Sequence, residues 1–103
     1  MTVSRLSDLS IEDDIRRVQL YRQILAFIRD NPGECRRYEV KADEEFRVDL
    51  ASQRIYGTPE LEWLVLLVCN MDDLLAGLPV GFSVLFPPLA TVRQMIRAVK
   101  DGE

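Results

Sequence analysis

The first long pattern of apolar and polar positions covers residues 10–30 and predicts an amphipathic helix. Ser10 is a good N-cap residue, and Asn31 with the Pro-Gly pair after it predicts the helix end. Apolar residues form a stripe that widens in the second half: Ile11, Ile15, Val18, Leu20, Tyr21, Ile24, Leu25, Phe27 and Ile28. This stripe can cover the chain's own core or a neighbouring subunit, and the pattern favours neither.

Two short strands are predicted on either side of two further helices, and we expect them to pair with each other in an antiparallel sheet. Residues 38–40 alternate apolar and polar side chains, and residues 83–86 form a second strand that a Pro-Pro pair ends. Residues 41–45 read as a charged turn, and residues 46–56 predict a short helix that Gly57 ends.

The next helix is unusually apolar. Thr58 can cap it, Pro59 suits its first position, and Asn70 is the expected stop. Between them, residues 61–69 are apolar nearly all round, interrupted only by Glu62. In so small a domain, this suggests that something else covers part of the helix. Trp63 is expected to be mostly buried.

A last amphipathic helix is predicted near the C-terminus. Residues 91–94 fit a capping box, so the helix is expected to begin there. Val92, Met95, Ile96 and Val99 follow the i, i+3, i+4, i+7 spacing of one helix face. We expect this face to contact either the strand-containing region or a partner.

Composition and charge narrow the function classes. The chain has 103 residues, 48% hydrophobic and 29% charged, which is typical of one folded domain. Its net charge of −4 argues against nucleic acid as the main ligand, because a phosphate-backbone binder normally carries a basic excess. The start shows no signal-peptide pattern, and the apolar run 61–69 is too short to span a bilayer. No membrane partner is therefore expected.

The chemistry-bearing residues predict no enzyme. The chain has no histidine, so a Ser-His-Asp or Cys-His arrangement cannot form within it. Cys35 and Cys69 are expected to be free thiols rather than a disulfide, and neither belongs to a C-x-x-C pair. Acidic clusters at 12–14, 43–45 and 72–73 lie in turns or at a helix start and read as solvated charges. We expect no catalytic residue, cofactor or metal ion.

The middle of the chain resembles a LysM module. Residues 38–57, YEVKADEEFRVDLASQRIYG, are similar to its opening: a Y-x-V strand, an acidic turn, a short helix, then an aromatic residue and glycine. Residues 78–87, LPVGFSVLFP, are similar to the closing strand, which usually reads L-x-x-G-x-x-L-x-I-P. Residues 56–64, YGTPELEWL, resemble the Y-G-x-P-E-L-x-W segment of LysM-like baseplate wedge proteins of contractile-tailed phages.

This resemblance implies an α+β fold with a LysM-like βααβ core at residues 37–88. An N-terminal helical arm at 1–36 and a C-terminal helix at 89–103 would flank it. It also implies a structural assembly protein of a phage tail baseplate or a contractile injection machine. The expected partners are other baseplate, hub or tail-tube proteins in multiple symmetric copies. The expected location is the virion tail baseplate, assembled in the host cytoplasm, or the bacterial cytoplasm for an injection system.

The helices that flank this core carry more apolar surface than so small a core covers, which marks them as partner-contacting. The residues expected at that interface are Val18, Tyr21, Leu25, Ile28, Trp63, Val92, Met95, Ile96 and Val99. The alternative function is a carbohydrate-binding LysM module that recognises peptidoglycan, with a groove between loops 42–47 and 71–78. A small cytoplasmic adaptor unrelated to tails is a third possibility.

Overall fold

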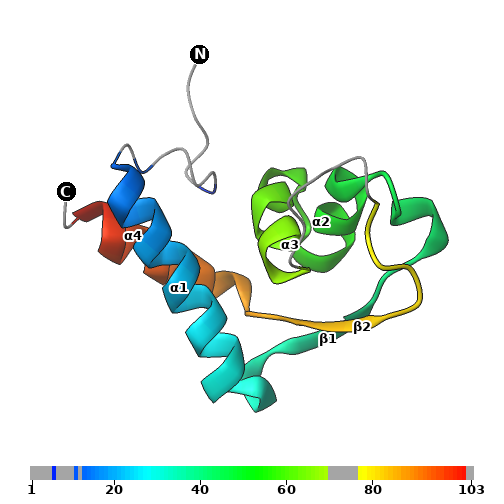
Figure 1. The fold of residues 1–103 in the computed structure, drawn as a ribbon, viewed down its shortest axis with the longest axis horizontal. Coiled ribbons are helices and arrows are strands. Elements are labelled where there is room, and N and C mark those ends of the chain that lie inside the picture. Colours follow the sequence, from blue (N-terminus) through cyan, green and yellow to red (C-terminus); the bar gives the residue numbers. More distant parts are fainter. Residues whose placement is uncertain (1–5, 7–10, 12, 70–76, 102–103) are drawn as a thin grey trace. The chain divides into compact units, whose positions relative to one another are not determined.

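The computed structural model describes residues 6, 11, 13–69 and 77–101, and it confirms the predicted α+β class. The α-helices within these ranges are α1 (Asp14–Asp30), α2 (Val48–Tyr56), α3 (Glu62–Val68) and α4 (Leu89–Asp101). The strands β1 (Arg36–Glu39) and β2 (Ser83–Phe86) form a two-stranded antiparallel sheet (Figure 1). The chain divides into two compact units, Arg36–Phe86 and the combination of Met1–Cys35 with Pro87–Glu103.

Helix α1 begins later than the sequence predicted. Its N-cap is Asp13, whose Oδ1 accepts a hydrogen bond from the Ile15 N–H at 2.9 Å. The predicted cap, Ser10, lies outside the described residues. The predicted end is confirmed, because the helix stops at Asp30 and the Asn31 N–H donates to the Phe27 carbonyl at 2.8 Å.

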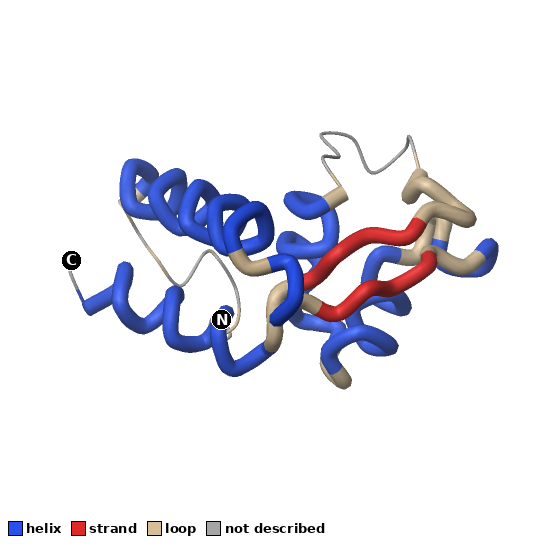
Figure 2. Tube along the Cα trace, turned by 90° about the horizontal axis from the view of Figure 1, so that it is seen from below, coloured by secondary structure: helices blue, strands red, loops and turns tan. Residues whose placement is uncertain are grey.

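The predicted pairing of the two strands is confirmed although they are far apart in the sequence. Tyr38 is the register partner of Val84, and Arg36 is the register partner of Phe86. Beyond the end of β1, the Val40 N–H donates to the Phe82 carbonyl at 3.1 Å and extends the pairing by one residue. Figure 2 shows the two strands running side by side along their whole length.

The connection from α2 to α3 follows from local backbone chemistry. Gly57 ends α2 with φ 77°, in the left-handed region that glycine enters without steric cost. The Thr58 hydroxyl then accepts from the Glu60 N–H at 3.3 Å. Pro59 opens a short 3₁₀ turn, η4 (Pro59–Leu61), from which α3 continues. The predicted stop of α2 at Gly57 is confirmed, whereas Thr58 caps η4 and not α3, whose N-cap is Leu61. The stop predicted for α3, Asn70, lies outside the described residues.

The core of the Arg36–Phe86 unit lies between the sheet and its two helices. Its fully or nearly fully buried members come from both strands' ends, both helices and the loop before β2: Val40, Val48, Ala51, Ile55, Val65, Leu78 and Phe86. The Phe86 ring meets the rings of Tyr38 and Tyr56 edge-on, with centroids 6.5 and 6.3 Å away. Edge-to-face aromatic pairs add to the free energy of apolar burial.

The other unit is a pair of helices, in which α4 crosses behind α1 in the view of Figure 1. Leu20 and Ile24 of α1 are buried, as are Val92 and Ile96 of α4. Helix α4 begins at Leu89, and the Pro88 carbonyl accepts the Val92 N–H at 3.1 Å. The capping box predicted at residues 91–94 is therefore wrong, since these residues already lie inside the helix.

Candidate functional site

One face of α1 exposes apolar side chains. Ile15, Val18 and Leu25 are 72%, 45% and 44% exposed. At 100° of rotation per residue they lie roughly opposite the buried Leu20 and Ile24. Large apolar side chains that recur on one exposed helix face are typical of a binding surface. This face, the α1 stripe, contains two of the residues that the sequence predicted at an interface.

Charged residues on the same face are sorted by sign along the helix. Asp14, at the N-terminal end, has an 88% exposed side chain and pairs with Arg17 at 2.8 Å. Arg29, near the C-terminal end, has a 75% exposed side chain and pairs with Asp30 at 3.1 Å. The Arg29 hydrogen bond lowers the pKa of Asp30. The α1 stripe therefore has an apolar centre, an acidic start and a basic end.

The other predicted interface residues are less accessible. Tyr21 and Ile28 lie on the flank of the α1 stripe and are partly buried. Val92, Ile96 and Val99 are buried and Met95 is partly buried, so the predicted stripe on α4 is already covered within the folded chain. Trp63 on α3 is also partly buried. The exposed part of the predicted interface is thus concentrated on α1.

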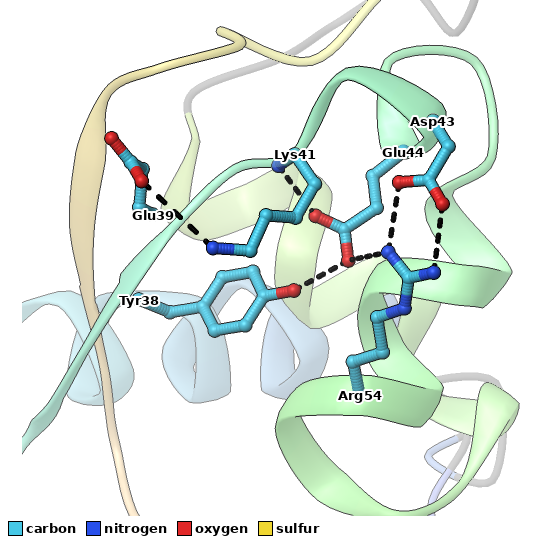
Figure 3. Close-up of polar contacts among 6 residues, drawn as sticks. All are labelled: Tyr38, Glu39, Lys41, Asp43, Glu44 and Arg54. Carbon is cyan, nitrogen blue, oxygen red and sulfur yellow. Dashed lines mark hydrogen bonds and ion pairs between the residues drawn. The ribbon is translucent and has the colours of Figure 1, made fainter.

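A second cluster centres on a buried carboxylate, Glu44, in the 3₁₀ turn η3 (Ala42–Glu44) after β1 (Figure 3). The sequence predicted a solvated loop charge, which is wrong, because the Glu44 side chain has no exposed surface. Its oxygens accept hydrogen bonds from the Tyr38 hydroxyl at 2.5 Å, the Lys41 backbone N–H at 2.7 Å and the Arg54 guanidinium at 3.1 Å. A buried carboxylate with this many donors is well compensated.

Arg54 links this buried group to the surface. Its guanidinium also forms a two-pronged pair with Asp43, at 2.8 and 2.7 Å. The hydrogen bond from Arg54 lowers the pKa of Asp43. Burial, with the hydrogen bond to Glu44 second, raises the pKa of Tyr38 to about 12. The cluster therefore links β1 to α2, because Tyr38 of β1 and Arg54 of α2 both donate to Glu44 of η3. Asp72 and Asp73, also predicted as solvated, lie outside the described residues.

Two loops, residues 40–47 and 77–82, are joined by backbone hydrogen bonds beyond the end of the sheet at which Glu39 pairs with Ser83. The Leu78 N–H donates to the Glu45 carbonyl at 2.7 Å, and the Gly81 N–H donates to the Val40 carbonyl at 2.9 Å. Phe46 and Phe82, one from each loop, are 65% and 68% exposed. These loops include the described part of the groove predicted for a glycan; residues 71–76 are outside the described ranges.

Gly77 makes the close approach of these loops possible. A Cβ at this position would lie 2.9 Å from Glu45 Cγ and 3.1 Å from Phe46 Cε1, and the backbone has φ 78°. Both the space and the conformation therefore require glycine. Sequence reasoning missed this residue, although a glycine directly before the Leu-Pro pair was a visible signal.

A pocket of about 530 Å³ lies beside α4. Three of its lining residues are cations spaced along one face of that helix. The lining residues are Leu6, Arg93, Ile96, Arg97, Lys100 and Asp101. Its charged lining residues are therefore three cations and one anion, Asp101, although the whole chain is acidic.

The described residues offer few other chemical groups. Cys35 and Cys69 are free thiols, as predicted, and burial raises the pKa of Cys69 to about 11. Within the ranges that the structure describes, no three His, Cys, Asp or Glu side chains are grouped to hold a metal ion. In the same ranges, no helix has the length and apolarity needed to cross a bilayer.

Comparison of the chain with protein-family models, with curated proteins and with solved structures found no match.

Proposed function

We propose that this chain is a structural assembly protein of a phage tail baseplate or of a related contractile injection machine. It would join neighbouring baseplate, hub or tail-tube subunits through protein–protein contacts. The observation that carries the proposal is the α1 stripe, because Ile15, Val18 and Leu25 stay exposed in the folded chain. Leaving three such side chains in water is unfavourable unless a partner covers them.

We further propose that the Arg36–Phe86 unit is a LysM-like βααβ module. The support for this proposal is that the two LysM-like strand motifs lie at or next to the two strands of the structure. The Y-x-V motif lies at β1, the L-P-x-G motif directly precedes β2, and the two strands pair with α2 and α3 between them. In this proposal the module is a rigid wedge, fastened by Glu44, and α1 is the arm that engages the neighbouring subunit.

The test compares two variants of α1 in the genome that encodes the chain, with an epitope tag on each. Val18→Asp places a charge on the stripe, and Gln23→Asp places the same charge on an exposed position well away from it. We expect both proteins to fold, and only Gln23→Asp to appear in purified contractile particles at the wild-type level. Failure to find the wild-type chain in any particle would refute the proposed function. Normal incorporation of Val18→Asp would exclude the stripe as the contact.

Peptidoglycan binding is the second candidate, and the two exposed phenylalanines favour it. Aromatic side chains on adjoining loops are a suitable surface for the apolar faces of sugar rings. Co-sedimentation with purified cell wall tests this function directly. Retention of the wild-type chain, lost on Phe46→Ala and Phe82→Ala but not on Val18→Asp, would favour the glycan reader over the assembly protein.

A further inference from the structure

We propose that the partner covering the α1 stripe is a second copy of this chain, bound by antiparallel pairing of the two α1 helices. The inference rests on the proposed function for one point only, namely that this stripe is an interface. The identity of the partner follows from the order of residues along the stripe.

Four exposed residues on α1 are arranged symmetrically except for the sign of their charge. Asp14, Val18, Leu25 and Arg29 follow one another at spacings of four, seven and four residues. At 100° per residue, these spacings keep all four side chains within roughly 60° of each other around the helix. The stripe therefore reads acid, apolar, apolar, base, with equal spacing at its two ends.

An antiparallel pair of such helices is complementary to itself. A two-fold axis between positions 21 and 22 brings Val18 opposite the partner's Leu25. The same axis brings Asp14 opposite the partner's Arg29. Each contact occurs twice, because the two surfaces of a two-fold interface are identical. Val18 and Leu25 are covered, and Asp14 and Arg29 each face an opposite charge, so a second copy of the chain supplies a complement to each of these four residues.

A parallel pairing of the same stripes lacks this complementarity. It would place Asp14 against Asp14 and Arg29 against Arg29, and close like charges oppose association. Arg22 lies on the edge of the stripe and near the two-fold axis in the antiparallel pair. It is exposed, so its aliphatic stem can cover apolar surface while its guanidinium stays in water. Arg22 lies near its own copy in either pairing, so the difference in charge between the two pairings comes from Asp14 and Arg29, which favour the antiparallel pair.

The ion pairs already present on α1 do not compete strongly with this contact. Asp14–Arg17 and Arg29–Asp30 are exposed pairs within one helix, and exposed pairs contribute little because water and salt screen them. One helix face is smaller than a standard protein–protein interface. We therefore expect reversible dimers with a dissociation constant on the order of 10 µM, which suits a contact that acts within a larger assembly.

The first test is sedimentation equilibrium of the purified full-length chain over a range of concentrations. We expect a monomer–dimer equilibrium in the wild type. Val18→Asp and Leu25→Asp should each raise the dissociation constant at least about tenfold, and the control Gln23→Asp should leave it within about twofold. Circular dichroism verifies that each variant is folded. If an Asp variant unfolds, Val18→Ser and Leu25→Ser replace it, with a smaller but still measurable weakening.

The second test establishes the direction of pairing by cysteine cross-linking, in a Cys35→Ser, Cys69→Ser background. A disulfide requires Cα atoms within about 7 Å. Arg22→Cys, near the two-fold axis, should cross-link to itself. Asp14→Cys should not, because the two copies of position 14 lie about 22 Å apart in the antiparallel pair. Mixing Asp14→Cys with Arg29→Cys protein should give the heterodimer.

Three results would overturn the inference: a wild-type chain that stays monomeric up to about 1 mM, a dimer unaffected by Val18→Asp and Leu25→Asp, or an Asp14→Cys chain that cross-links to itself. The particle assay separates this failure from failure of the proposed function. A monomeric wild type whose Val18→Asp variant is still excluded from particles rejects self-pairing and keeps the assembly role. A wild-type chain that forms the dimer but is absent from every particle keeps the self-pairing and rejects the assembly role.

Discussion

Glu44 offers the sharpest test of how this chain is held together. Replacing it with alanine removes a buried carboxylate and leaves the Tyr38 hydroxyl and the Lys41 N–H without their acceptor. Both hydrogen bonds are part-buried, and a donor left unsatisfied in a buried setting costs about 1–3 kcal/mol. Arg54 keeps its paired contact with Asp43, which limits the loss on that side. We therefore expect Glu44→Ala to lower the free energy of unfolding by about 2–4 kcal/mol.

A loss of this size is a large share of the total stability of a small domain. It corresponds to a fall in Tm on the order of 15 °C for a chain of this length. The measurement is urea unfolding, followed by circular dichroism and by the fluorescence of Trp63, which lies on α3 in the same unit. Glu44→Gln should be intermediate, because its amide keeps an acceptor for Lys41 but presents a donor to the remaining partners.

The matched control is Glu39→Ala, which removes an exposed carboxylate whose ion pair with Lys41 is 3.8 Å long. An exposed pair of that kind contributes little, so its removal should change stability by less than about 1 kcal/mol. Equal small losses for Glu44→Ala and Glu39→Ala would refute the reasoning, since burial and hydrogen bonding would then make no difference between the two glutamates.

Three further changes test other parts of the fold. Ile96→Asp puts a charge at a site only 5% exposed and should destabilise the isolated chain by more than about 3 kcal/mol, seen in thermal melting; a normal melt would mean that α4 is not packed on α1. Ser52→Ala removes a hydroxyl that donates to Thr58 and accepts from Leu61, and should cost about 1–3 kcal/mol in urea unfolding, unlike a change at an exposed serine. Because the pKa of Tyr38 is raised from 10.0 to about 12, the folded chain keeps a proton that the unfolded chain loses, so stability should fall between pH 10 and 12. Tyr38→Phe should remove that part of the pH dependence, and an unchanged alkaline profile would contradict the assigned shift.

The features that the sequence predicted well are those that depend on neighbouring residues. Gly57 and Thr58 end one helix and cap the next turn through contacts within a few positions, so their residue types were sufficient signals. Both strands were also predicted, the first from alternating side chains at residues 38–40 and the second from the Pro-Pro pair that ends it, although β1 begins two residues earlier, at Arg36. Their pairing followed from the order of motifs rather than from either strand alone.

Features that depend on distant residues were predicted less well. Glu44 stands in an acidic turn, and nothing nearby indicates that Arg54, ten positions later, joins Tyr38 in covering it. The start of α4 was misplaced because Thr91 fits a capping box, while the preceding prolines already allow a helix to begin at Leu89. On α1 the sequence showed a wide apolar stripe, but only the position of α4 decides which part of it stays in solvent.

The register of the sheet has a consequence for the order of folding. Arg36 and Phe86, the first and last residues of their unit, are strand partners, so formation of the sheet brings the two ends of that unit together. Before then, α1 and α4 are tethered by a flexible chain of about 50 residues; afterwards, only a few residues at each helix end remain free. Shortening that tether lowers the entropic cost of joining the helices by about 2 kcal/mol. We expect hydrogen exchange during refolding to protect the amides of β1 and β2 before those of α4. Folding of the Arg36–Phe86 unit would then bring together the segments to which α1 and α4 are attached.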